Sequence, residues 1–213
     1  ATLSADVDVT TLTVGNTVAN VVFSGNGSSV VDAVSFANDG TLTLGTNGGT
    51  QTYNGGLTTT SVGGTVTVNG TIASSDDTIT FGAITLGNNV TIDTNSTTTN
   101  RADITIAAVT GGNNTLTLTT ENDVTGTDIT ASGNISGIAQ LTLANVGGTA
   151  TLSADVDVTT LVVDNTVANV AFTGNGSSVT NAVSFANDGT LTLGASGGTQ
   201  TYNGGLTTTS VGG

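Results

Sequence analysis

Paired aspartates are the residues of this sequence whose types and spacing most readily suggest chemistry. Asp6 and Asp8 are separated by one residue, the same pair returns as Asp155 and Asp157, and Asp76 stands next to Asp77. On an extended strand, residues i and i+2 face the same side, about 7 Å apart. The two carboxyl groups of an inverting glycosidase are separated by a similar distance. Acid–base cleavage of a polysaccharide is therefore the catalytic hypothesis that these pairs allow.

The rest of the composition argues against catalysis. The chain has no His, Cys or Lys, so the usual general bases and activated nucleophiles are missing. Without Cys it forms no disulfide and no thiolate zinc site, and without Lys it forms no Lys–Asn isopeptide bond. We therefore expect a non-enzymatic protein with no catalytic residue, cofactor or bound metal, in which the aspartates are solvated outward-facing side chains.

Two acidic stretches suggest calcium binding more loosely. "SSDD" begins at Ser74 and "TENDVTGTD" begins at Thr120, and both are rich in the oxygen ligands that Ca²⁺ prefers. The glycine-rich calcium nonapeptide G-G-x-G-x-D does not occur in the chain. We expect both stretches to be solvated loops.

The charge balance excludes two classes of partner. The formal net charge is −14, and Arg101 is the only basic side chain. Binding to nucleic acid, or to an anionic membrane surface, needs clusters of Lys and Arg. The acidic surface is better understood as a feature that keeps neighbouring molecules apart and soluble.

Apolar and polar residues alternate along most of the chain. Examples are "TLTLG" at Thr41, "TVTVNG" at Thr65 and "ADITIAAV" at Ala102. A period of two predicts half-buried β-strands, no stretch has the 3.6-residue period of a helix, and the intervening Thr residues are expected to face outward. The residues predicted to point inward are Leu42, Leu44, Val66, Val68, Ile79, Phe81, Ile84, Leu86, Ile92, Ile104, Ile106, Leu116, Leu118, Leu141 and Leu143.

A long internal repeat organises these strands. Residues 1–64 align without a gap with residues 150–213, and 56 of the 64 positions are identical. We interpret residues 1–213 as one continuous solenoid segment, in which 1–149 form one full repeat and 150–213 begin the next. The chain is most simply a window from a longer array.

A weaker periodicity predicts a parallel β-helix. "VGGT" occurs at Val62 and Val146, and "SVGG" returns at the end of the chain. The first two marks are 84 residues apart and the last two are 65 apart. The difference is roughly one coil, which indicates about 20 residues per coil and about four plus about three coils per unit. Clusters of Gly and Asn mark the corners, since these residues tolerate positive φ. An antiparallel β-sandwich is the alternative. We expect an all-β solenoid with essentially no helix.

Two further patterns have simple explanations. Thr-x-Thr pairs such as Thr41/Thr43 and Thr65/Thr67 suggest the flat Thr grid of an ice-binding β-solenoid, but their unequal spacing predicts that they do not line up. Seven N-x-S/T sequons occur, the number that chance predicts for this composition. They start at Asn26, Asn69, Asn89, Asn95, Asn113, Asn134 and Asn175.

The stretches "GGTQTYNGGLTTTSVGGTVTVNGTI" and "NISGIAQLTLANVGGTATLSADV" resemble the repetitive passenger regions of giant bacterial autotransporter adhesins of the rickettsial outer-membrane type. They are similar, more loosely, to filamentous-haemagglutinin-like exoproteins. The resemblance implies a right-handed parallel β-helix at the cell surface that serves as a stalk, adhesin or fibre. Its partners would be further copies stacked end to end, and other cells or surfaces through regions outside residues 1–213. The alternatives are a self-assembling filament or sheath protein without a binding tip and, less strongly, an ice-binding solenoid.

Overall fold

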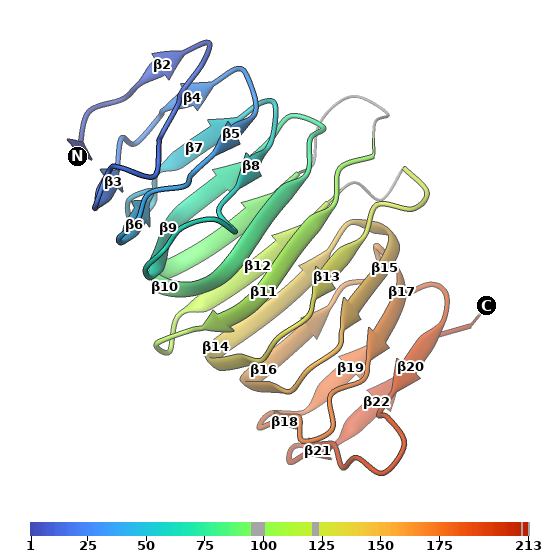
Figure 1. The fold of residues 1–213 in the computed structure, drawn as a ribbon. Helices are drawn as coiled ribbons and strands as arrows, with labels where there is room; N and C mark the ends of the chain where they lie inside the picture. Colours follow the sequence, from blue (N-terminus) through green and yellow to red (C-terminus); the bar gives the residue numbers. More distant parts are fainter. Residues whose placement is uncertain (95–100, 121–123, 210, 213) are drawn as a thin grey trace.

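The chain folds as a parallel β-solenoid of about nine turns. The computed structural model describes residues 1–94, 101–120, 124–209 and 211–212. These residues form strands and turns without any helix. Each strand runs parallel to the strands that it pairs with. The coils stack into a rod with the two chain ends at its opposite ends (Figure 1). The predicted fold class is confirmed, whereas the right-handed sense of the coil stays a prediction.

Most turns of the coil contain three short strands, and longer strands bend around a corner. The bounds are β1 Thr2–Leu3, β2 Asp8–Val9, β3 Val21–Phe23, β4 Ser29–Val30, β5 Val34–Ser35, β6 Leu42–Leu44, β7 Thr50–Tyr53, β8 Leu57–Thr58, β9 Val66–Ala73, β10 Ile79–Asp93, β11 Ile104–Thr110, β12 Thr115–Thr119, β13 Ile129–Ala131, β14 Ile135–Ala144, β15 Val146–Leu152, β16 Val156–Val163, β17 Val167–Phe172, β18 Ser178–Val179, β19 Val183–Phe185, β20 Leu191–Leu193, β21 Thr201–Tyr202 and β22 Leu206–Thr208.

Strand pairing defines three faces of the rod, each a column of residues in register. The first face runs through Thr2, Val22, Thr43, Thr67, Thr85, Thr110, Ser136, Asp157, Ser178 and Thr201. The second runs through Asp8, Ser29, Thr52, Ala73, Asp93, Thr119 and Ala144 and continues into β16, β19 and β22. The third runs through Ser35, Thr58, Thr80, Thr105, Thr130, Thr151, Ala171 and Thr192.

Coil length varies while the register of the faces is kept. Registered residues are 18 positions apart at Thr67 and Thr85 and 26 apart at Thr110 and Ser136. The prediction of about four plus about three coils per 149-residue unit agrees with the structure, which has slightly fewer than seven. Six steps along the first face lead from Thr2 to Ser136, and Thr151, the copy of Thr2, lies two faces further on. The unit therefore spans six and two-thirds turns.

The interior of the rod consists of apolar ladders that run along its axis. Ile79, Ile104 and Ile129 stack in register on the third face, and Leu42, Val66 and Ile84 stack on the first. All fifteen residues predicted to point inward are buried, because a half-buried strand must turn one side of its pleat toward the core. Their burial confirms the strand assignment and its register.

Corners are built by Gly and Asn, as predicted. Gly45 has φ of +74°, and a Cβ there would collide with the carbonyl oxygen of Asn69. The fully buried Asn38 closes another corner by donating from Nδ2 to the carbonyl oxygens of Gly40 and Thr41, both at 3.0 Å. Its copy Asn187 makes the equivalent bond to Thr190 at 2.9 Å.

The two copies of the repeat differ only outside the buried core. Every residue at the eight differing pairs is partly or fully exposed. Conserving the inward side preserves the stacking of each coil on its neighbours, so the differences leave the fold unchanged. The differing pairs are Thr13/Val162, Gly15/Asp164, Val22/Ala171, Ser24/Thr173, Val31/Thr180, Asp32/Asn181, Thr46/Ala195 and Asn47/Ser196.

The described residues contain no helix long and apolar enough to cross a membrane.

Candidate functional site

One corner of the rod carries two of the longer connections between strands. The chain leaves the second face at Asp93 and at Thr119, and it reaches the third face at Ile104 and at Ile129. Loops held on a rigid scaffold commonly carry the functional residues of a fold, so this corner is the first candidate site.

Buried threonines form hydrogen bonds to the backbone near the ends of these two connections. Thr94 donates from Oγ1 to the carbonyl oxygen of Ala102 at 2.9 Å. Thr120 donates from Oγ1 to the carbonyl oxygen of Asn145 at 2.7 Å, and Thr127 donates to the carbonyl oxygen of Val124 at 3.2 Å. All three side chains are at most 1% exposed. These hydroxyls satisfy backbone groups that the strand ladder leaves open at this corner.

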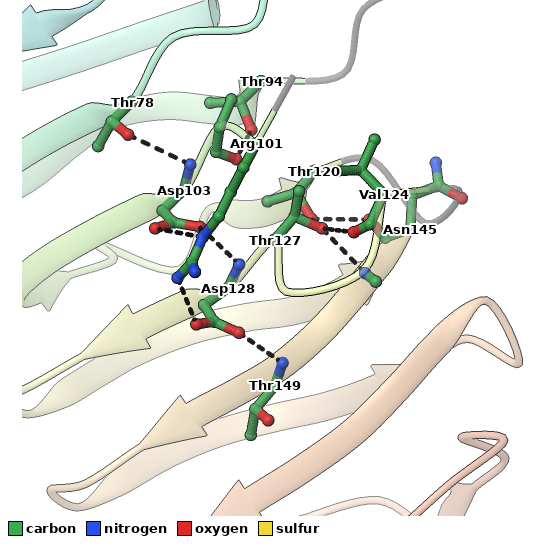
Figure 2. Close-up of polar contacts among 12 residues, drawn as sticks. Thr78, Thr94, Arg101, Asp103, Thr120, Val124, Thr127, Asp128, Asn145 and Thr149 are labelled. Atoms are coloured by element: carbon green, nitrogen blue, oxygen red, sulfur yellow. Dashed lines mark hydrogen bonds and ion pairs between the residues drawn. The ribbon is translucent and has the colours of Figure 1, made fainter. Parts of the chain in front are cut away.

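Arg101 joins two carboxylates of neighbouring coils beside these loops. Its Nε lies 3.1 Å from Oδ1 of Asp103, and one terminal nitrogen lies 2.9 Å from Oδ2 of Asp128 (Figure 2). Hydrogen bonding to Asp103 and the negative charge of Asp103 raise the pKa of Arg101, with a smaller contribution from Asp128. The only basic side chain of the sequence therefore offsets the repulsion of two carboxylates that stack on successive coils.

The same carboxylates also bond to the backbone of the next coil. Asp103 Oδ1 accepts the amide N–H of Asp128 at 2.8 Å, and Asp128 Oδ1 accepts that of Thr149 at 2.8 Å (Figure 2). Carboxylates that accept backbone N–H bonds and pair with Arg are already satisfied. The arrangement is an axial clamp that holds successive coils together.

The aspartate pairs singled out in the sequence mostly serve the same purpose. Asp6 Oδ1 accepts the N–H of Gly27 at 2.8 Å, and its copy Asp155 accepts that of Gly176 at 2.7 Å. Asp8 Oδ1 accepts the N–H of Ser29 at 3.1 Å. Oxygens of Asp6, Asp8 and Asp155 thus cap the coil above. The structure does not bring the two pairs together, since 149 residues of solenoid separate them.

The stretches considered for calcium give no cation site among the described residues. No three acidic side chains in the parts of the chain that the structure describes lie close enough to share a metal ion. Ser74 is buried and donates from Oγ to the carbonyl oxygen of Asp77, which closes the turn in which Asp76 has φ of +67°. Three residues of the second stretch, Glu121, Asn122 and Asp123, lie outside the described residues.

The sequons fall at different places in the fold. Asn69 is buried and donates from Nδ2 to the carbonyl oxygen of Leu44 at 3.1 Å, so its amide is engaged inside a corner. Asn95 lies outside the described residues. The other five, at Asn26, Asn89, Asn113, Asn134 and Asn175, are exposed.

Outward threonines form continuous columns, which corrects the expectation that they do not line up. Unequal spacing in the sequence is absorbed at the corners, so the strands keep their register. Each face has one such column. The columns are Thr43, Thr67, Thr85 and Thr110 on the first face, Thr50, Thr71, Thr91, Thr117 and Thr142 on the second, and Thr58, Thr80, Thr105, Thr130 and Thr151 on the third.

Two shallow grooves on the rod are copies of each other. One, of about 380 Å³, is lined by Asp8, Val9, Thr10, Ser29 and Val31. The other, of about 320 Å³, is lined by Asp157, Val158, Thr159, Ser178 and Thr180, together with Asn113, Gly137 and Ile138 of earlier coils. The first five positions of the second groove are those of the first shifted by 149, and Thr180 replaces Val31 at one of them.

Sequence reasoning missed the grooves and the Arg101 clamp. Both depend on which coils become neighbours, and Arg101 and Asp128 are 27 residues apart. The presence of a single basic residue in an acidic chain was the one available signal for the clamp. Comparison of the chain with protein-family models, curated proteins and solved structures gives no significant match.

Proposed function

We propose that this chain is a non-enzymatic structural segment of an extracellular surface fibre or adhesin stalk. The observation that carries the proposal is the rod itself, in which parallel strands stack from coil to coil along all three faces. Such a solenoid is quasi-one-dimensional, so its length grows with the number of coils while its cross-section stays constant. A fold of this kind suits the task of spanning a distance.

The pattern of sequence change supports a mechanical role. Core residues are identical in the two copies of the repeat, and all eight differences lie outside the buried core. The described carboxylates Asp6, Asp103, Asp128 and Asp155 bond to the backbone of a neighbouring coil. These polar groups add axial bonds where the strand ladder is interrupted at corners, which stabilises stacking.

Antibody labelling of intact cells tests the surface location. Antibodies raised against the purified chain are applied to unpermeabilised cells of the organism that encodes it. Labelling without permeabilisation, lost after brief external proteolysis, is the expected result. Labelling that requires permeabilisation contradicts the proposal.

A self-assembling filament or sheath protein without a binding tip is the alternative proposal. Parallel pairing from coil to coil along all three faces supports it as well as it supports a stalk. Electron microscopy of the purified chain at rising concentration separates the two: axial filaments favour self-assembly, and single short rods favour a stalk segment.

Ice binding is the weaker alternative. A flat ice-binding face needs adjacent columns of Thr, whereas each face here has one continuous column with mixed neighbours. On the third face, the column that includes Asp103, Asp128 and Thr149 flanks the threonines. We expect no thermal hysteresis from the purified chain, and a measurable freezing-point gap would reinstate this function.

A further inference from the structure

Copies of one residue lie on different faces of the rod. Asp8 belongs to the second face, in register with Ser29 and Thr52. Its copy Asp157 belongs to the first face, in register with Ser136 and Ser178. Thr2 and Thr151 are likewise copies, and they lie on the first and third faces.

The local structure around each copy is nevertheless the same. Asp8 stacks beneath Ser29, which continues to Thr52, and Asp157 stacks beneath Ser178, which continues to Thr201. The three residues of the first stack are the same three residues of the second, shifted by 149 positions. The whole repeat is therefore displaced as a body around the axis, and its internal pairing is unchanged.

The cause is the mismatch between the repeat and the turn. Because the unit spans six and two-thirds turns, each copy begins two faces further round the coil than the previous copy. This position is one face short of a complete seventh turn. At a spacing of about 4.8 Å between stacked strands, the same displacement advances about 32 Å along the axis. The two grooves show this displacement: the groove at Asp8 lies on strands of the second face, and the groove at Asp157 lies on strands of the first.

We infer that the repeat is a one-third-turn screw, so that every surface feature encoded once per unit is displayed on a different face in each successive unit. The groove lined by Asp8, Thr10, Ser29 and Val31, and its copy, face in different directions.

The screw also determines how rods pack against each other. If the unit spanned a whole number of turns, identical patches would align in one continuous stripe, and two rods would associate along it with every unit in contact. The offset distributes each patch and the surface carboxylates around the axis. Any side of the rod then presents a given patch only once in three units, which opposes side-by-side bundling.

Paired cysteines test the offset directly, because the chain has no native Cys. Thr43→Cys/Thr192→Cys labels two copies of one position on the first and third faces. Thr43→Cys/Thr201→Cys labels two positions of the first face at a similar separation. Each purified protein is treated with a short bis-maleimide linker, which is too short to join the two sites within one rod.

The two variants should form different products on a denaturing gel. Same-face thiols allow two linkers between the same pair of rods, so Thr43→Cys/Thr201→Cys should accumulate as doubly linked dimers. Thiols on different faces recruit different neighbours, so Thr43→Cys/Thr192→Cys should continue to trimers and larger chains. Single Thr43→Cys should stop at a singly linked dimer. Equal accumulation of closed dimers by both double variants would overturn the inference.

A second set of variants repeats the test at other positions of the same two faces. Val22→Cys/Ala171→Cys labels copies on the first and third faces, and Val22→Cys/Ser178→Cys labels the first face twice. The same contrast between open chains and closed dimers is expected. Circular dichroism on each variant verifies that the strand content is retained before linking. If the same-face and different-face variants give the same cross-linked products in both sets, the inference is refuted.

Discussion

Tyr53 donates its hydroxyl proton to Oε1 of Gln51 at 3.1 Å, and both side chains are fully buried inside the rod. Gln51 in turn donates from Nε2 to the carbonyl oxygen of Phe23 at 2.7 Å. The Tyr53 ring packs against Phe23 and Phe36, with centroids 6.4 and 6.3 Å apart. A polar bridge and an aromatic cluster thus fill the interior at the same level, and Gln200 and Tyr202 repeat the bridge in the last coil.

Tyrosine titration should separate these two sites. Burial raises the pKa of Tyr53 far above its ordinary value, and it raises the pKa of the half-buried Tyr202 to about 12. The unfolded chain ionises its tyrosines near pH 10. The stability that the neutral hydroxyls contribute is therefore fully present below about pH 10 and is lost as the pH rises toward the folded-state values.

Tyrosinate absorbance against pH gives the measurement. In folded protein, the transition should be shifted well above that of free tyrosine, and Tyr202→Phe should leave only the later, Tyr53 component. Denaturant unfolding midpoints should fall as the pH rises above about 10, and less so in Tyr53→Phe/Tyr202→Phe. An ordinary tyrosine transition in the folded protein contradicts burial of these rings.

Removing an inward side chain should destabilise the rod far more than removing its outward neighbour. Ile106→Ala deletes a fully buried side chain in the middle of the stack, and a large-to-small core change of this kind costs about 2–5 kcal/mol. Thr105→Ala changes the adjacent residue on the solvent side and should alter stability by only about 0.5 kcal/mol. Urea unfolding of both variants is the measurement, and equal losses would contradict the burial of Ile106 on the inward side of the strand.

The axial bond of Asp155 should contribute measurably to stability. Asp155→Ala removes the acceptor of the 2.7 Å bond from Gly176, and the expected loss is about 1 kcal/mol. Asp155→Asn retains a side-chain oxygen at the same position and should lose less. Thermal unfolding of the two variants, compared with amide hydrogen exchange at Gly176, reports the bond. Identical behaviour of Ala and Asn would show that the oxygen is not used.

Arg101→Gln should destabilise the middle of the rod in a salt-dependent manner. The change leaves the carboxylates of Asp103 and Asp128 facing each other without the cation that bridges them. Screening weakens their repulsion as ionic strength rises, so the difference in melting temperature from the original chain should shrink at high salt. A difference that salt does not alter would indicate lost packing instead.

The aspartate pairs should support no polysaccharide cleavage. Asp6 and Asp155 each accept a backbone N–H from the next coil, which is a stabilising task. Incubation with a panel of soluble polysaccharides, with and without Ca²⁺, should release no reducing ends or unsaturated products. Release that disappears in Asp6→Asn/Asp8→Asn would identify a glycosidase or lyase and refute the structural proposal.

The sequence by itself determined the elements and their inward side. Alternation of apolar and polar residues decides which side of a strand is buried, because successive side chains point to opposite faces. Ile104 and Ile106 were therefore predictable as core, and Thr105 as surface. The repeat of 149 residues likewise indicates a stacked architecture from the sequence alone, since similar coils bury each other's apolar edges.

Only the tertiary structure decided which coils and corners become neighbours. Corners accept different numbers of residues without disturbing the register, so spacing in the sequence does not reveal that Thr43, Thr67 and Thr85 align. For the same reason, the contact of Arg101 with Asp128, the paired grooves and the one-third-turn offset between Asp8 and Asp157 were not readable from spacing. The number of residues that each turn consumes depends on the corner geometry, and this geometry forms only when the coils stack.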